Sequence, residues 1–343
     1  MTRVVPSALA LLAGLVLALS VPFDLGASLQ AQGSGEVVVY SSRSHYGSEP
    51  VFEAFTQQTG IRVTFLMGNN NEVFERLRSE GARTKADMLL TVDAGNLWNA
   101  AREGLLAPVD SAVLEKNIPA RLQDPQNRWF GLAVRARTIM YNTARVKPAE
   151  LSTYEALGDP RWKGRLCLRT STNIYNQSLL ASFIRQYGEA QAEKIVRGWI
   201  ANQPTYINGD TQILEAIAAG KCDVGITNTY YLARLVEKNP AFPVAPFWPD
   251  QGAGGVHVNV SGAGITANAT NKAQALRLLE FLSTPEAQAV LAGASFEYPA
   301  NEAVPMHDLL RKWGSFKPQP AGVASAGEFQ AAAVKLADRA GYK

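Results

Sequence analysis

The chain has 343 residues, of which 47% are hydrophobic and 18% charged, with 28 glycines and 18 prolines. This composition excludes an intrinsically disordered or collagen-like chain, and the length favours two domains or one large α/β unit. The formal net charge is only +3. Because so small a balance supplies no dense basic surface, we do not expect the chain to bind nucleic acid.

The first residues are typical of a secretory signal peptide. Arg3 precedes an apolar run at residues 8–19, and small residues follow up to Ala31. That run is too short to span a bilayer, and no later apolar run is long enough to do so. We therefore expect residues 1–31 to be removed on export, leaving a protein without a membrane span.

Export changes how the two cysteines are interpreted, because an oxidising compartment permits disulfides. Cys167 and Cys222 both lie at the margins of apolar, strand-like segments. Their spacing is compatible with one disulfide and equally with two buried thiols.

Short β-branched runs alternate with amphipathic stretches after residue 31. The first such unit contains predicted strands and helices in the order strand 37–40, helix 50–59, strand 61–66, helix 72–80 and strand 86–92. This alternation predicts an α/β fold with a mixed sheet flanked by helices.

A second unit repeats the pattern with strand 166–168, helix 177–187, strand 223–227 and helix 230–237. Two long segments with β-like alternation, 131–142 and 256–267, fall where a two-lobed protein would cross between its lobes. The predicted organisation is therefore a discontinuous lobe 1 at 36–134 and 264–320, lobe 2 at 135–263, and a C-terminal connector with a last helix at 321–343.

The usual catalytic signatures are absent from the sequence. It contains no HExxH, CxxC, GxxxxGK[ST] or GxSxG motif, and Val260-Ser-Gly-Ala-Gly264 lacks the glycine two positions before its serine. These absences do not exclude an enzyme, but none of the usual catalytic signatures supports one. The alternative from another class is a secreted hydrolase or redox enzyme that uses His45 or His257.

Four tyrosines lie just after predicted strands, where open α/β sheets bind their ligands. They are Tyr46, Tyr175, Tyr230 and Tyr231. The adjacent pair lies at a strand-to-helix turn, where both phenols can point into one cleft, unlike neighbours within a strand.

Phenolate oxygens at such a cleft would be ligands for a particular class of metal ion. Only a strongly acidifying cation makes it favourable to ionise a group with a pKa of about 10 at neutral pH. Calcium and magnesium prefer carboxylates and carbonyls, and soft metals prefer thiolates, so hardness favours ferric iron.

Several blocks, in this order, resemble the periplasmic ferric-ion-binding proteins that supply ABC-type iron importers. The resemblance covers nearly the whole mature chain, and the blocks that carry it are Val38-Val-Tyr-Ser-Ser-Arg-Ser-His-Tyr46, Thr91-Val-Asp-Ala-Gly-Asn-Leu97, Asn173-Ile-Tyr-Asn-Gln-Ser178, Gly220-Lys-Cys-Asp-Val-Gly225, Asn228-Thr-Tyr-Tyr-Leu-Ala-Arg234 and Asn259-Val-Ser-Gly-Ala-Gly264.

The resemblance implies a two-lobed periplasmic binding protein of the class II type that carries Fe(III) in the cleft between its lobes. It implies Tyr175, Tyr230 and Tyr231 as ligands from lobe 2, with Tyr46 and the preceding His45 from lobe 1. Ser44 separates Arg43 from His45 here, whereas in some members the arginine directly precedes the histidine.

The resemblance also implies partners and charge-balancing groups. The expected partner is an ABC transporter permease at the inner membrane, and the binding protein is expected to be a periplasmic monomer. A small synergistic anion such as carbonate would complete the iron coordination. The residues expected to hold this anion or to balance charge are Arg43, Arg135, Arg137 and Arg234.

A second binding-protein interpretation keeps the fold and changes the ligand. The same architecture serves organic cations of the polyamine or thiamine type and sugars, and Asp93 and Trp98 are the residues that could line such a pocket. An organic cation would need several carboxylates and an aromatic box, and the strand ends clearly offer only Asp93.

Overall fold

The computed structural model describes residues 35–43 and 49–343. The predicted signal peptide and the candidate ligands His45 and Tyr46 lie outside these residues. Within the described part of the chain, none of the helices combines the length and apolarity needed to cross a bilayer.

The first part of the sheet is built around three parallel strands, as predicted. β1 (Gly35–Ser41) lies between β2 (Ile61–Met67) and β3 (Met88–Val92) and is parallel to both. The helices that belong to this part are α1 (Glu49–Thr59), α2 (Asn70–Glu80), α3 (Ala94–Arg102), α4 (Ala112–Asn117), α9 (Lys272–Ser283) and α10 (Pro285–Ser295). Val37, Val39, Phe55 and Leu278 are fully buried in the core beneath these helices.

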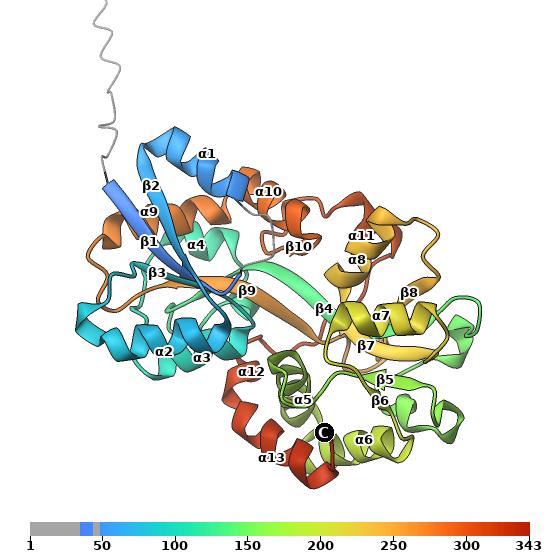
Figure 1. The fold of residues 1–343 in the computed structure, drawn as a ribbon. Coiled ribbons are helices and arrows are strands. Elements are labelled where there is room, and N and C mark those ends of the chain that lie inside the picture. Colours follow the sequence, from blue (N-terminus) through green and yellow to red (C-terminus); the bar gives the residue numbers. More distant parts are fainter. Residues whose placement is uncertain (1–34, 44–48) are drawn as a thin grey trace, which may run out of the picture. The chain divides into compact units, whose positions relative to one another are not determined.

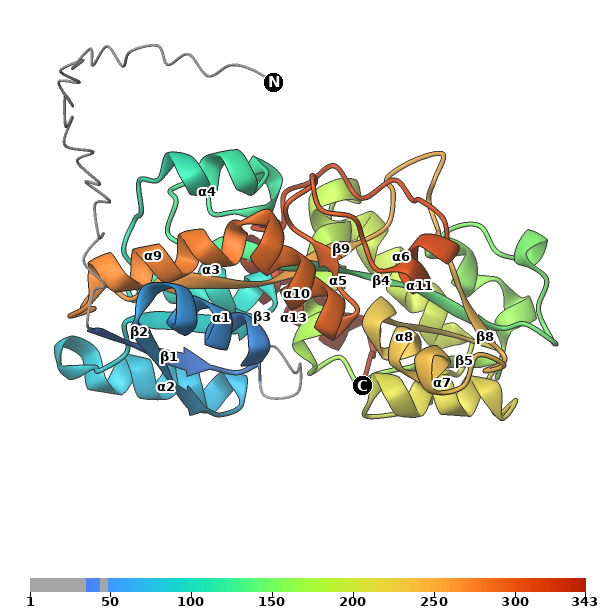
Figure 2. The same cartoon turned by 90° about the horizontal axis from the view of Figure 1, so that it is seen from above.

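The second part has shorter strands and its own hydrophobic core. Its strands are β5 (Leu166–Leu168), β6 (Thr205–Tyr206), β7 (Val224–Asn228) and β8 (Val244–Phe247), and its helices are α5 (Ile174–Tyr187), α6 (Glu189–Ala201), α7 (Asp210–Ala218) and α8 (Thr229–Lys238). Trp162 and Trp199 are its largest buried side chains. Figure 2 shows the two groups of elements on opposite sides of the central strands.

The two predicted crossover segments are β4 (Phe130–Asn142) and β9 (Val258–Ile265), which run antiparallel to each other (Figure 1). β9 also pairs with β3, and β4 pairs with β7, so the main path through the sheet is β2-β1-β3-β9-β4-β7-β5-β6, and β8 pairs with β4 off this path. A Cβ atom at Gly262 of β9 would collide with the carbonyl oxygen of Phe130. The Ser-Gly-Ala-Gly segment therefore serves close strand packing, not a nucleophile turn.

The end of the chain differs from the loose connector expected before a last helix. The last helix is present as α13 (Gln330–Ala340), but it follows directly on the short helix α12 (Ser325–Glu328). Val323, Ala326 and Gly327 are buried, and a Cβ at Gly327 would overlap the ring of Trp98. Low side-chain volume in this segment therefore allows close packing of α12 against α3 and α5. β10 (Tyr298–Pro299), which pairs with β4, and α11 (Asp308–Lys312) precede it.

Cys167 and Cys222 form a disulfide, and this resolves the two alternatives left open by their spacing. Cys167 lies in β5, and Cys222 lies just before β7, the strand parallel to β5. Their Cα atoms are 5.8 Å apart, within the usual range for a disulfide.

The disulfide closes a sequence separation of 55 residues, and in the chain-entropy model such a loop stabilises by roughly 3–4 kcal/mol. We expect the double substitution Cys167→Ala/Cys222→Ala to lower the free energy of unfolding by about this amount in urea titrations. Wild-type protein that is denatured without reductant should show no free thiol. Two titratable thiols under these conditions would contradict the pairing.

Candidate metal centre

Tyr175 lies in the first turn of α5, a helix that begins earlier than the predicted start at residue 177. The N-cap residue Asn173 starts it, since its side chain accepts a hydrogen bond from the Tyr175 backbone N–H at 3.0 Å. Tyr175 is buried and packs beside Val92 at the end of β3.

Tyr230 and Tyr231 occupy the first turn of α8, directly after β7. Their ring centroids are 4.3 Å apart with an interplanar angle of 39°. Tyr230 is fully buried, and its hydroxyl donates to the Tyr175 hydroxyl over 3.4 Å and accepts from Asn228 Nδ2 over 3.3 Å. The structure thus brings three of the four sequence-predicted tyrosines together, with their helix N-termini at the same edge of the sheet.

Guanidinium groups surround the phenol of Tyr175. The Cζ atoms of Arg135, Arg137 and Arg169 lie 5.7, 5.9 and 5.6 Å from its ring centroid, and Arg234 lies 5.2 Å from the Tyr230 ring. Positive charges this close favour the ionised form of a phenol. Of these four arginines, Arg169 is the one that sequence reasoning missed.

Two buried carboxylates hold the arginines in place. Glu297 lies 3.2 Å from Arg43 Nη2 and 3.9 Å from Arg135 Nη1. Asp210 lies 2.9 Å from Arg137 Nη1 and 3.5 Å from Arg169 Nη1. These two carboxylates therefore anchor the four guanidinium groups beside the tyrosines.

The donors of Arg137 are used within the protein. Its Nε, Nη1 and Nη2 donate to Asn176, Asp210, Asn228 and the carbonyl oxygen of Ile226. These bonds occupy the donors of the guanidinium. Of the two roles expected for Arg137, charge balance therefore fits these contacts better than direct binding of an anion.

Burial raises the pKa of Tyr231, and the neighbouring Tyr175 and Asp210 act in the same direction. A buried phenol in this position is neutral unless a cation replaces its proton. The phenol of Tyr231 is therefore held in its neutral form within this cluster.

Asp93 joins the first and second parts of the fold at this edge. Its carboxylate accepts hydrogen bonds from Gly95 N–H at 2.9 Å and from the Ser178 hydroxyl of α5 at 2.7 Å. Its backbone has φ of 76°, a conformation that non-glycine residues rarely adopt. Burial raises the pKa of Asp93, while Arg135 and its hydrogen-bond donors oppose this shift. These contacts fix the first turn of α5, which carries Tyr175, against α3.

Asp93 and Trp98, the two residues considered for an organic ligand, are engaged in contacts within the protein. Asp93 is fully buried, and the Trp98 ring is covered by Arg102, whose Cζ lies 5.0 Å from the ring centroid. In the described residues, no three histidines, cysteines or carboxylates gather in a way that could hold a metal. The phenols are therefore the chemically distinctive group of this edge.

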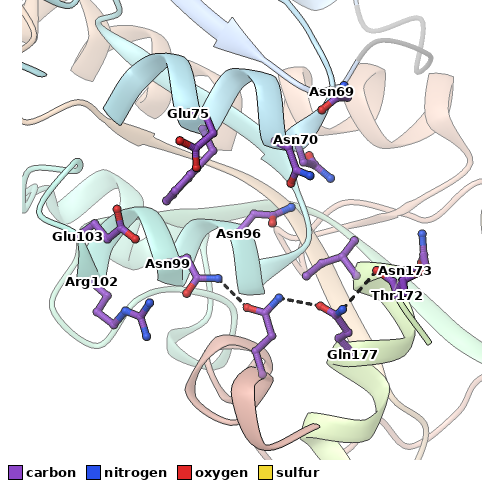
Figure 3. A pocket seen from close by; sticks show the side chains of 14 residues that line it. Asn69, Asn70, Glu75, Asn96, Asn99, Arg102, Glu103, Thr172, Asn173 and Gln177 are labelled. Atoms are coloured by element: carbon purple, nitrogen blue, oxygen red, sulfur yellow. Dashed lines mark hydrogen bonds between the residues drawn. The ribbon is translucent and has the colours of Figure 1, made fainter. Parts of the chain in front are cut away.

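A polar pocket of about 650 Å³ lies between α2, α3, α5 and α13 (Figure 3). We call it the carboxamide pocket, because asparagine and glutamine side chains supply more than half of its lining. They include Asn70, Asn96, Asn99, Asn173, Gln177 and Gln330. Tyr175, Tyr230 and Tyr231, the candidate tyrosines that the structure describes, do not line it. Sequence reasoning missed this pocket because its residues come from four separate helices.

His257, the histidine of the enzyme alternative that the structure describes, is a core residue. It is 2% exposed, and its Nδ1 lies 3.1 Å from Gln319 Oε1. Burial lowers its pKa to about 3, and Arg137 and Arg135 contribute to this. A neutral, inaccessible ring has no substrate to act on, which removes the support for a hydrolase built on His257.

The chain belongs to the bacterial extracellular solute-binding protein family, whose model matches residues 83–317. This confirms the expectation of a binding protein and no enzyme.

Relatives that match almost the whole length of the chain make the comparison more specific. The chain is 42% identical to iron uptake protein A1 of Synechocystis over 90% of its own length and 88% of that protein. It is similar to a solved structure from Trichodesmium, IdiA or FutA in complex with iron and citrate ligands, with a TM-score of 0.86, 43% identity and coverage of 90% and 100%. Apo FutA2 from Synechocystis gives a TM-score of 0.84 at 40% identity, with coverage of 91% and 100%. The predicted fold and the resemblance are thus confirmed.

The depressed pKa of His257 makes stability depend on pH. Its folded-state value of about 3 lies below the ordinary 6.5, so the stabilisation is complete above pH 6.5 and is lost as the pH falls towards 3. The loss is about 1.4 kcal/mol per pH unit within this window. We expect His257→Gln to flatten the dependence of unfolding free energy on pH between 6.5 and 4.5, measured by urea titration. An unchanged slope would show that His257 is protonated in the folded state.

Proposed function

We propose that this protein captures Fe(III) through tyrosine phenolates and delivers it to an ABC transporter permease. The observation that carries the proposal is the cluster of Tyr175, Tyr230 and Tyr231 under several guanidinium groups. Tyr46 and His45 are proposed as further ligands from sequence alone, because they lie outside the described residues.

The chemistry of the donors supports iron as the substrate. Three phenolates would neutralise the charge of one ferric ion, and the surrounding arginines would offset the cost of ionising phenols in a buried place. The helix N-termini of α5 and α8 add favourable partial charge beside these oxygens. Calcium and magnesium prefer carboxylate ligands, and the carboxylates described at this edge are already engaged by other protein groups.

The relatives support the same substrate. Iron uptake is named for the Synechocystis relative, and the Trichodesmium structure holds iron and citrate. We propose Arg43, Arg135, Arg137 and Arg234 as the residues that balance charge at the iron site or hold a synergistic anion such as carbonate, with charge balance as the role that the hydrogen bonds of Arg137 favour. Infrared spectroscopy of the iron-loaded protein should show the bands of the bound anion. These bands should disappear when the iron is removed.

We also propose the lobe boundaries predicted from sequence, with residues 36–134 and 264–320 closing on residues 135–263 about β4 and β9. Ligands divided between the lobes favour the closed state, so iron shifts the population towards it. Small-angle scattering of iron-free and iron-loaded protein should show compaction on loading. Identical profiles would argue against a divided site.

Delivery places the protein in the periplasm, with a permease at the inner membrane as its partner. Vesicles that contain the permease should take up radiolabelled iron from the loaded protein. Equal uptake from free ferric iron without the binding protein would contradict the delivery role.

The substitution Tyr230→Phe/Tyr231→Phe tests the ligands, because it removes two oxygens and keeps both rings. We expect Fe(III) affinity to fall by more than about a hundredfold, with loss of the visible phenolate-to-iron absorption band. Tyr187→Phe, at the other end of α5, is the matched control and should retain both. Unchanged iron binding and colour in the double variant would disprove the assignment.

Oxidation state and pH should change affinity in predictable directions. Reduction to Fe(II) removes one charge and much of the acidity that keeps phenols ionised, so ferrous iron should bind more weakly. Protons compete for the same oxygens, so the affinity for Fe(III) should fall as pH decreases. Ferric and ferrous titrations at pH 7.5 and 5.5 measure both effects. Equal affinities at both pH values would rule out phenolate coordination.

A further inference from the structure

Most of the side chains that line the carboxamide pocket are uncharged. The charged residues of its described lining are Glu75, Arg102 and Glu103, and all three are at exposed positions. Its interior groups are amides, together with the half-buried ring of Phe74. A small anion or cation would therefore find no buried counter-charge there.

The amides of this pocket are held in fixed orientations by hydrogen bonds. Asn99 Nδ2 donates to Gln330 Oε1 at 2.6 Å, Gln330 Nε2 donates to Gln177 Oε1 at 2.9 Å, and Gln177 Nε2 donates to the carbonyl oxygen of Thr172 at 3.3 Å (Figure 3). This series of hydrogen bonds ends on the carbonyl oxygen of Thr172. Because a carbonyl oxygen can only accept, the direction of every hydrogen bond in the series is fixed.

Other amides are tied at one end in the same way. Asn96 Nδ2 donates to the carbonyl oxygen of Val92 at 2.8 Å, and Asn70 Oδ1 accepts from the Thr91 hydroxyl at 3.1 Å. Within the described residues this leaves acceptors at Asn96 Oδ1 and Asn99 Oδ1, and a donor at Asn70 Nδ2, with no protein partner. The pocket thus offers donors and acceptors in preset directions and without charge.

We propose that the carboxamide pocket binds an uncharged polyhydroxylated molecule, such as a small saccharide or polyol. A hydroxyl both donates and accepts, so it matches an alternation of amide oxygens and amide N–H groups, and Phe74 can cover an apolar sugar face. The volume of about 650 Å³ is within the range of small-molecule sites. The same chemistry could come from a free saccharide or from the hydroxyl-rich part of an organic iron chelate.

This inference uses none of the tyrosines, so it stands or falls separately from the iron proposal. The experiment is isothermal titration of the full mature chain with sucrose and with myo-inositol, in the absence and presence of Fe(III). We expect saturable binding with a dissociation constant of about a millimolar or below. Glucose 6-phosphate, which brings charge, should bind more weakly than glucose.

Asn96→Ala and Asn70→Ala each remove one pocket amide from a half-buried position, and each should weaken binding by about three- to tenfold. Asn239→Ala, at an exposed position after α8, is the matched control and should change nothing. The variant Tyr230→Phe/Tyr231→Phe should lose iron and keep saccharide binding.

The outcomes divide cleanly. Binding without iron that is lost in the pocket variants identifies a free saccharide as the source. Binding that requires iron and is lost in the same variants identifies a hydroxylated chelate. No saturable binding under either condition, or binding that the pocket variants leave unchanged, overturns the proposal.

Discussion

The cost of placing an ionised phenol inside a protein governs the rest of this site. Burial favours the neutral form and raises the pKa of Tyr231. The structure offsets the cost with guanidinium groups within 6 Å of the Tyr175 ring. Those arginines are themselves buried charges, so they need Glu297 and Asp210 as partners. The tyrosines, arginines and carboxylates therefore form one electrostatic unit.

The fold positions these residues by repeating one local arrangement of strand, cap and helix. A strand ends, a polar residue caps or begins the next helix, and the functional side chain follows in the first turn. Asn173 does this for Tyr175, and Asn228 precedes α8 for Tyr230. Asp93 does it for α3 while its carboxylate also bonds Ser178 of α5. These helix starts bring the phenols of Tyr175 and Tyr230 within hydrogen-bonding distance of each other.

Sequence reasoning reached the parts of this arrangement that are local. The strand-helix alternation predicted the mixed sheet, and the two predicted crossover segments are β4 and β9. Tyr175, Tyr230 and Tyr231, which were predicted to lie at one edge of the sheet, lie together there. α5 begins three residues before the predicted start at residue 177, because the side chain of Asn173 caps the helix at that point. The connector before α13 was judged from composition, which does not show that small residues pack closely against Trp98.

The parts that sequence reasoning missed depend on contacts between distant residues. Glu297 reaches Arg43 and Arg135 because β10 pairs with β4, and Asp210 reaches Arg137 from the start of α7. The carboxamide pocket takes residues from four helices, so no window of sequence contains it. Pairings of this kind follow from tertiary topology, and neither spacing nor periodicity encodes them.

The central claim is that ferric iron sits on the phenolic oxygens of this electrostatic unit. Anomalous diffraction at the iron absorption edge, from crystals of the iron-loaded mature chain, locates the metal without reference to any variant. The account predicts one anomalous peak in bonding contact with the hydroxyl oxygens of Tyr175, Tyr230 and Tyr231. A peak elsewhere, such as in the carboxamide pocket or on surface carboxylates, with the three phenols free of metal, would contradict it.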